Sequence, residues 1–233
     1  MKLGVGAEFS DSRLPKGAVI GPLVVCGAVF DENDLPKLKE LGVKDSKLLS
    51  PTQRERMRDG IEKIAKVFII EKLQPWDIDM GRGDGVNLNR LEVLKFINIV
   101  NKAFEKFTID KVVIDAPDPN LPKFNLMLSN LIKRGNLKII AEHRADLNHI
   151  ECSAASVLAK TTRDADIEIL KTKYGDFGAG YPSDPKCIEW LKNRLEVGKL
   201  PDIVRHSWDT ISNLKDKKLQ NDLKKFFSVV KEV

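Results

Sequence analysis

Two acidic residues lie just beyond short apolar segments in the second half of the chain. Asp115 directly follows the mostly apolar residues 111–114, and Asp146 lies a few residues after a second apolar segment at 137–141. Segments of this length and composition are typical of buried strands, and open α/β sheets gather ligand sites at the carboxyl ends of their strands. The pattern therefore predicts two carboxylates at one edge of a sheet.

Carboxylates gathered at one place repel one another unless divalent cations lie between them. A pair of magnesium ions held in this way can hydrolyse a phosphodiester, since one ion activates water and the other stabilises the leaving oxygen. Each acid also has a simpler interpretation: Asp115 as a cap on the turn that Pro117 favours, and Asp146 as a solvated loop acid. The spacing alone leaves both alternatives open.

Most of the expected strands lie in the first half of the chain, with one helix between them. The expected strands are residues 2–6, 20–30 and 66–73. Short spacers between them favour antiparallel pairing. Ser50, Pro51 and Gln53 mark a helix start, because serine caps the first turn, proline suits the first helical position and glutamine completes a capping box.

The second half alternates helices and strands. The expected elements are a long helix from residue 87, a strand at 111–114, a helix at 120–133 and a strand at 137–141. Beyond about residue 185 the pattern is helical, and the tail from residue 212 to 233 is predicted to be a lysine-rich amphipathic helix. The predicted fold class is therefore α/β, with a mixed sheet flanked by helices and a C-terminal helical subdomain.

Composition is consistent with one main domain outside the membrane. The chain has 233 residues, of which 42% are hydrophobic, and this is enough to bury one substantial core. No window reaches the roughly 18 consecutive apolar residues of a membrane span, and the N-terminus lacks the pattern of a secretory signal. Three isolated cysteines fit reduced, packed thiols better than a disulfide framework. We therefore expect a cytoplasmic protein, and a monomer because no heptad pattern is present.

Charge gives a weaker indication of the partner. The net charge of +5 and the pI near 9.0 favour a polyanion, because basic side chains near phosphates displace condensed counterions. However, 39 basic residues accompany 34 acidic ones, and an ordinary solvated surface explains the same composition. Charge alone therefore does not separate a nucleic-acid-binding protein from other soluble proteins.

Several motifs, taken in order along nearly the whole chain, resemble type 2 ribonuclease H in its archaeal form. The central motif runs from Ala141-Glu142-His143-Arg144-Ala145-Asp146 through Ser153-Ala154-Ala155-Ser156 to Lys160 and Arg163-Asp164. The others are Lys44-Asp45-Ser46-Lys47, Val113-Ile114-Asp115-Ala116, Gly178-Ala179-Gly180-Tyr181-Pro182-Ser183-Asp184-Pro185 and Leu200-Pro201-Asp202. Independent motifs in the order of one family make the resemblance specific.

The resemblance implies a ribonuclease H-like catalytic domain at residues 1–198 and a C-terminal helical extension at 199–233. It implies an endonuclease that uses Mg²⁺ or Mn²⁺ to cleave the RNA strand of RNA/DNA hybrids and to nick DNA at embedded ribonucleotides. Asp115 and Asp146 match two of the family's catalytic, metal-binding carboxylates. Tyr181 matches the tyrosine that packs against the deoxyribose beside the ribonucleotide, and Ser46 and Lys47 match substrate-binding positions.

The first catalytic motif of the family is altered in this chain. Where the family has the six residues Asp-Glu-Ala-Gly-Arg-Gly, this chain has the twelve residues from Gly6 to Gly17, without the acidic pair or the Gly-Arg-Gly string. Aligned from the left, Gly6 and Ala7 occupy the acid positions; aligned from the right, Ser12 and Arg13 do. The departure predicts weakened metal binding and ribonucleotide selection. Glu8 and Asp11 are candidates to replace the missing catalytic acids, with Glu8 as a metal ligand, and a solvated loop is the alternative.

Three hypotheses of function follow. The first is an active two-metal endonuclease in which Asp115 and Asp146 are the surviving ligands. The second is a non-catalytic protein that binds RNA/DNA hybrids on the same fold. The third is an active enzyme whose first motif is misread in the sequence, which resequencing of the gene would decide. A second Gly-Arg-Gly string, at Gly81-Arg82-Gly83, is predicted to be a flexible loop before the long helix.

Overall fold

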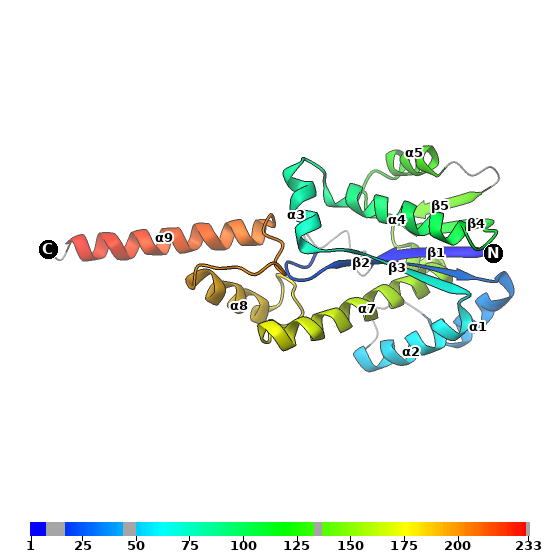
Figure 1. Cartoon of the computed structure of the whole chain (residues 1–233), viewed down its shortest axis with the longest axis horizontal. Coiled ribbons are helices and arrows are strands. Elements are labelled where there is room, and N and C mark those ends of the chain that lie inside the picture. The colour runs from blue at the N-terminus through cyan, green and yellow to red at the C-terminus, as the bar shows by residue number, and fades with distance from the viewer. Residues whose placement is uncertain (8–16, 44–49, 133–136, 232–233) are drawn as a thin grey trace.

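The centre of the protein is a five-stranded mixed sheet (Figure 1). A computed structural model describes residues 1–7, 17–43, 50–132 and 137–231. The strands are β1 (Lys2–Ala7), β2 (Leu23–Phe30), β3 (Val67–Leu73), β4 (Lys111–Asp115) and β5 (Lys138–Glu142), in the order β3-β2-β1-β4-β5. The first three strands pair antiparallel, whereas β1, β4 and β5 run parallel. The mixed sheet and the antiparallel pairing of the first strands were both predicted.

Helices cover both faces of the sheet. One face carries α3 (Pro75–Gly83), α4 (Leu88–Phe104) and α5 (Leu121–Leu131), and the other carries α1 (Leu35–Glu40), α2 (Pro51–Ile64) and α7 (Ile150–Tyr174) (Figure 1). Strand β2 is buried on both faces, because its side chains alternate between two apolar clusters. Val25 and Val29 pack in the cluster that includes α4, whereas Val24 and Ala28 pack in the cluster that includes α7.

Helix α7 lies unusually close to the central strand β1. A Cβ atom added at Gly4 would lie 2.0 Å from the carbonyl oxygen of Glu151, and one added at Gly6 would lie 2.2 Å from Ser156 Oγ. The small residues 153–156 allow the same approach from the side of the helix. This packing fixes the start of α7, and with it the short helix α6 (Ala145–Asn148), against the end of the sheet that carries the acids.

The C-terminal region begins with a segment that packs into the main body. Ile20 and Val204 form a β-bridge, and Trp208 Nε1 donates a hydrogen bond to the carbonyl oxygen of Gly17 at 3.2 Å. Helix α8 (Pro185–Glu196) precedes this segment, and α9 (Asp209–Lys231) follows it and extends away from the sheet (Figure 1). The C-terminal helices are as predicted, and the domain boundary after residue 198 remains a prediction.

Two local predictions have opposite outcomes. The helix start at Ser50 is confirmed, because Ser50 and Gln53 exchange side-chain-to-backbone hydrogen bonds in a capping box. The flexible loop predicted at Gly81-Arg82-Gly83 is wrong, because these residues form the last turn of α3. The backbone N–H of Gln74 donates to Asp77 at 2.9 Å and starts this helix. Gly81 is needed for packing, since a Cβ there would lie 2.8 Å from Leu91 of α4.

Three short elements were not predicted: the helices α1 and α6, and the 3₁₀ turn η1 (Glu32–Asp34) that precedes α1. No helix in the described part of the chain is both long enough and apolar enough to cross a membrane. The three cysteines are buried free thiols, as expected of packing residues.

Candidate active site

The two acids singled out from the sequence lie at one edge of the sheet. Asp115 is the last residue of β4, and Asp146 lies in α6, which follows the neighbouring strand β5. Both are buried, with exposed fractions of 4% and 5%. The backbone N–H of Ala145, the residue before Asp146, donates a hydrogen bond to Asp115 Oδ1 at 3.2 Å. This contact brings the two acidic positions together, and the burial of Asp146 is inconsistent with a solvated loop acid.

A tight turn after β5 directs Asp146 back toward β4. The carbonyl oxygen of Glu142 accepts a hydrogen bond from Ala116 N at 3.0 Å, so the ends of the two strands stay together. Arg144 then adopts a left-handed backbone conformation with φ 57°, which is uncommon for a residue other than glycine. The chain reverses there and enters α6, where Asp146 is in the first turn.

A third acid, at the end of β5, has other partners. Glu142 Oε1 accepts a hydrogen bond from Asn148 Nδ2 at 2.9 Å, and His149 Nε2 lies 3.2 Å from the same oxygen. These contacts link the end of β5 to the residue that precedes α7 and orient the His149 ring.

The surroundings of the two aspartates are negatively charged and enclosed. Burial raises the pKa of the Cys152 thiol well above its ordinary value, and three nearby acids raise it further. These acids are Asp115, Asp146 and Glu151. Lys111 Nζ lies 2.8 Å from Glu151 Oε1 and balances that charge. A site of this kind attracts cations, because buried carboxylates are stabilised by a positive charge nearby.

The type of donor at this edge fits a hard divalent cation. Mg²⁺ and Mn²⁺ prefer carboxylate oxygens, and Asp115 and Asp146 supply them. Among the residues that the structure describes, no group of three or more histidine, cysteine or acidic side chains could hold a metal ion. The predicted catalytic residues Glu8 and Asp11, and the predicted substrate-binding residues Ser46 and Lys47, lie outside the described residues.

Position 6 lies beside Asp115 and has no side chain to offer. Val5 is aligned with Ile114 in the parallel pair of β1 and β4, which places Gly6 alongside Asp115. The hydroxyl of Ser156 on α7 lies where a side chain of residue 6 would begin. The described part of β1 therefore ends at the acidic edge of the sheet without contributing a carboxylate.

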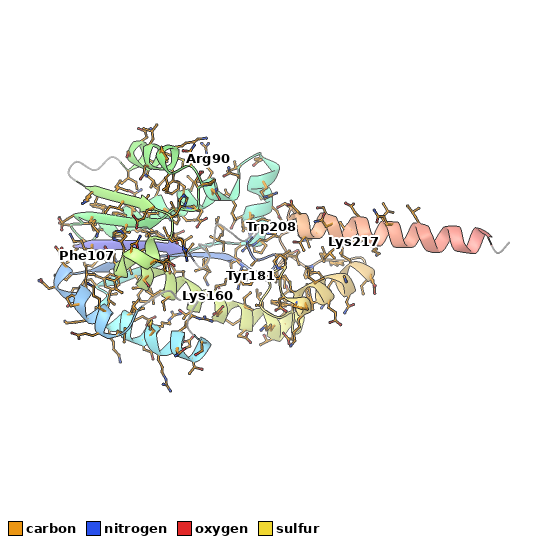
Figure 2. The ribbon with its side chains drawn as sticks, turned by 180° about the vertical axis from the view of Figure 1, so that it is seen from behind. Arg90, Phe107, Lys160, Tyr181, Trp208 and Lys217 are labelled. Atoms are coloured by element: carbon orange, nitrogen blue, oxygen red, sulfur yellow. The ribbon has the colours of Figure 1, made fainter. Side chains whose placement is uncertain are left out.

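The predicted sugar-contacting residue, Tyr181, lies on a glycine-rich loop that follows α7. Gly178 and Gly180 have positive φ values of 67° and 78°, which glycine adopts without strain. The ring of Tyr181 has Arg163 Cζ 4.6 Å from its centroid and Lys160 Nζ 5.8 Å from it. Figure 2 shows Tyr181 and Lys160 side by side. Lys160 and Arg163 both belong to the central motif, but the sequence predicted no role for either. Their i, i+3 spacing places them on one face of α7.

A cavity of about 660 Å³ adjoins Asp146 on the side of α1. Its lining residues are Glu32, Leu35, Pro36, Lys39, Val43 and residues 146–151. No local pattern indicates this cavity, because one wall is built by the short elements η1 and α1, which were not predicted. Its lining includes Asp146 but not Asp115.

The model of the family described as Ribonuclease HII matches residues 15–211 of this chain. The chain belongs to the ribonuclease HII family. It is 40% identical to the Ribonuclease HII of Pyrococcus abyssi (strain GE5 / Orsay) over 218 residues, which cover 91% of this chain and 95% of the relative. The Ribonuclease HII of Thermococcus onnurineus (strain NA1) is 41% identical over 211 residues, covering 90% of each chain.

Solved structures of the same family share this fold. The crystal structure of the ribonuclease H2 from Pyrococcus horikoshii OT3 has a TM-score of 0.80 and 37% identity, and the match covers 93% of this chain and 97% of that one. The ribonuclease HII in a complex with PCNA from Archaeoglobus fulgidus has a TM-score of 0.79 and 36% identity, covering 92% and 96%. The predicted family and its ribonuclease H-like α/β fold are thus confirmed. The family model begins at residue 15.

Proposed function

We propose that this member of the ribonuclease HII family is a metal-dependent endonuclease that cleaves the RNA strand of RNA/DNA hybrids and nicks DNA at embedded ribonucleotides. The observation that carries the proposal is the pair of buried carboxylates, Asp115 and Asp146, joined through the N–H of Ala145 at the carboxyl ends of β4 and β5. Burial makes charged aspartates costly, and cations bound between them lower that cost.

Asp115 and Asp146 would hold Mg²⁺ or Mn²⁺ at this edge. When bound, a pair of such ions supplies an activated water and stabilises the oxygen that leaves the phosphate. The N–H of Ala145 donates to Asp115 at 3.2 Å, and the turn at Arg144 leads into α6, where Asp146 follows Ala145. Tyr181 would pack against the sugar of the neighbouring nucleotide.

The altered first motif is expected to weaken this chemistry. Gly6 and Ala7 carry no carboxylate, so Glu8 and Asp11 are proposed as replacements, with Glu8 as a metal ligand. If neither reaches the metal, the protein would bind hybrids without cleaving them, which is the second candidate function. Alanine at both positions should lower the affinity for Mn²⁺, and an unchanged affinity would show that neither is a ligand.

The deciding experiment measures cleavage of a DNA duplex that contains one ribonucleotide, with Mg²⁺ or Mn²⁺. Asp115→Asn and Asp146→Asn should each abolish cleavage. Asp110→Asn is a matched control, because Asp110 precedes the opposite end of the same strand β4, where it pairs with the N-terminal ammonium. Equal cleavage by Asp115→Asn and Asp110→Asn would refute the assigned site. Hybrid binding without any cleavage by the unchanged protein would support the non-catalytic function.

Helix α9 is proposed to dock PCNA. The proposal is supported by the PCNA complex of the relative from Archaeoglobus fulgidus. In this chain α9 extends away from the sheet and carries exposed Leu219 and Leu223, with exposed fractions of 60% and 48% (Figure 1). Residues four apart share one face of a helix and can enter a groove as anchors. Leu223→Glu should weaken PCNA binding, whereas Val197→Glu, at an exposed apolar position beyond α8, should not.

The protein is also proposed to act as a monomer in the cytoplasm. Size-exclusion chromatography with light scattering should give a mass near 26.2 kDa. A concentration-independent dimer would contradict the monomer.

A further inference from the structure

A buried arginine stacks on the ring of Tyr181 and ties together three parts of the chain. Arg163, on α7, has an exposed fraction of 1%. Its Nη2 donates hydrogen bonds to the carbonyl oxygens of Ile20 and Ala179, both at 3.2 Å. Its Cζ lies 4.6 Å from the centroid of the Tyr181 ring. A planar guanidinium can stack on a ring and donate in its own plane at the same time, which an ammonium cannot do.

A second cation holds the same ring. Lys160 lies one helical turn before Arg163, with Nζ 5.8 Å from the ring centroid. Its direction is fixed by Asp164, whose Oδ1 lies 2.6 Å from that Nζ. Asp164 is held in turn by Arg54 of α2, at 3.2 Å. Cations within about 6 Å of an aromatic ring attract its face.

The backbone of the tyrosine loop is locked to the same arginine. The carbonyl oxygen of Gly180 accepts hydrogen bonds from Val19 N at 2.8 Å and Ile20 N at 3.1 Å. A Cβ at Gly180 would lie 3.0 Å from the Ile20 carbonyl oxygen and 3.4 Å from Arg163 Nη2. The loop therefore cannot move toward or away from α7 without breaking contacts of Arg163.

We propose that Arg163 is a positioning residue that fixes the Tyr181 ring and thereby sets the preference for a ribonucleotide next to deoxyribose. Arg163 is buried beneath the ring and acts through it, without touching nucleic acid. This inference rests on the proposed function, in which Tyr181 packs against a sugar. The positioning itself is a property of the folded protein and can be measured without substrate.

The chain supplies a matched control for Arg163. Arg205 is also 1% exposed, its Cζ lies 5.1 Å from the centroid of the Trp208 ring, and its Nε donates to the carbonyl oxygen of Gly21 at 3.1 Å. The two arginines thus share burial, an aromatic partner and a bond to neighbouring carbonyls. They differ in that Arg205 stacks on Trp208 and Arg163 stacks on Tyr181.

The first arm of the test uses fluorine NMR of the full chain labelled with 3-fluorotyrosine. The chain has two tyrosines, so Tyr174→Phe assigns the resonance of Tyr181. Arg163→Lys should shift or broaden that resonance, and Arg205→Lys should leave it in place. An unchanged resonance in Arg163→Lys, or an equal change in Arg205→Lys, would overturn the proposal. Lys160→Met, at a less buried position, should shift the same resonance and decides the matter if Arg163→Lys does not fold.

The second arm measures binding by fluorescence anisotropy in an Asp115→Asn background, which prevents cleavage. The probes are a DNA duplex with one ribonucleotide and the same duplex without it. Arg163→Lys should reduce the ratio of the two affinities by about 3- to 10-fold, the range expected from losing one ring–cation contact. In a Tyr181→Ala background the same change should have no further effect, and a full effect there would overturn the proposal. If the unchanged protein does not distinguish the probes, the proposed substrate is wrong, while the resonance still decides the positioning.

Discussion

The close contact between β1 and α7 predicts that alanine at Gly4 and alanine at Gly6 change the stability of the protein by very different amounts. Alanine at Gly4 would place its Cβ 2.0 Å from the carbonyl oxygen of Glu151 and 2.6 Å from the backbone nitrogen of Cys152. These are main-chain atoms of a helix and cannot rotate away. Alanine at Gly6 would meet Ser156 Oγ at 2.2 Å, but its next contact is at 3.1 Å. A serine hydroxyl can turn to another rotamer, so the obstacle at Gly6 is removable.

These distances set the expected free energies of unfolding. Overpacking a core typically costs about 1–3 kcal/mol, and occasionally more where neither side can yield. Gly4→Ala should therefore cost about 3 kcal/mol or more. Gly6→Ala should cost about 1 kcal/mol, because alanine also restricts the unfolded chain and recovers about 0.4–1 kcal/mol.

Ser156 provides the internal check. Its hydroxyl is buried and has no hydrogen-bond partner among the residues that the structure describes. Ser156→Ala should therefore leave stability unchanged or raise it by about 1 kcal/mol, since a buried unsatisfied group costs about that much. Combined with Gly6→Ala it should restore the original stability, and combined with Gly4→Ala it should restore nothing.

Urea unfolding followed by tryptophan fluorescence measures all five variants. The midpoint should fall at constant m-value, since the change is in native packing and not in the area exposed. If Gly4→Ala is no more destabilising than Gly6→Ala, or if Ser156→Ala fails to relieve Gly6→Ala, the close approach of α7 to β1 is refuted.

Three further outcomes are expected. The pKa of Asp176 is lowered first by a hydrogen bond from Lys186 and then by one from Gly178 N. The ionised Asp176 side chain therefore stabilises the folded protein fully above about pH 4, and this stabilisation is lost as the pH falls through the lowered pKa. The urea midpoints of Asp176→Asn and the unchanged protein should therefore differ at pH 6 and converge toward pH 2; a constant difference would contradict this. Burial raises the pKa of the Cys187 thiol to about 12, so all three buried thiols should react with a disulfide reagent at pH 8 only after unfolding, and rapid labelling of the native protein would refute it. Gly6→Asp in a Ser156→Ala background should raise Mn²⁺ affinity, measured by calorimetry, and an unchanged affinity would show that position 6 does not reach the metal.

Much of the fold could be predicted because local signals and burial agree. Residues 23–30 alternate between two apolar clusters, and Ser50, Pro51 and Gln53 form the helix start that their types favour. The end of α3 could not be predicted in this way. Glycine usually indicates a turn, but Gly81 lies in a helix, where its missing side chain leaves room for Leu91 of α4. This is a contact between two helices, and no local sequence pattern predicts it.

In the candidate site, the sequence predicted the positions of only those side chains that lie at or just after the end of a strand. Asp115 and Asp146 lie where strand order and parallel pairing put them. Arg163 was unpredictable as a support for Tyr181, because its partners are distant along the chain. Its contacts with Ile20 and Ala179 join separate segments, and only the folded chain brings them to one guanidinium. The cavity beside Asp146 likewise depends on the unpredicted helix α1.

The described residues on the two sides of residues 8–16 are anchored independently. On one side, β1 is held by its neighbours in the sheet and by α7, and its register with β2 continues to Ala7. On the other side, Gly17 accepts a hydrogen bond from Trp208, and Val19 N donates to Gly180 at 2.8 Å.

Independent anchoring separates the effects that the proposed alteration of the first motif would have on the carboxylates from those on Tyr181. The supports of Tyr181 all lie on the C-terminal side of it: Arg163, Lys160 and the pairing of Gly180 with residues 19 and 20. The carboxylates depend on the N-terminal side, where β1 ends beside Asp115 with no acid of its own. The change should therefore act on metal binding and the rate of cleavage, and leave the contact with the sugar and the affinity for the duplex intact. Binding and cleavage must therefore be measured separately. Loss of cleavage alone would place the effect on the N-terminal side, at the carboxylates, and loss of binding alone would place it on the C-terminal side, at Tyr181.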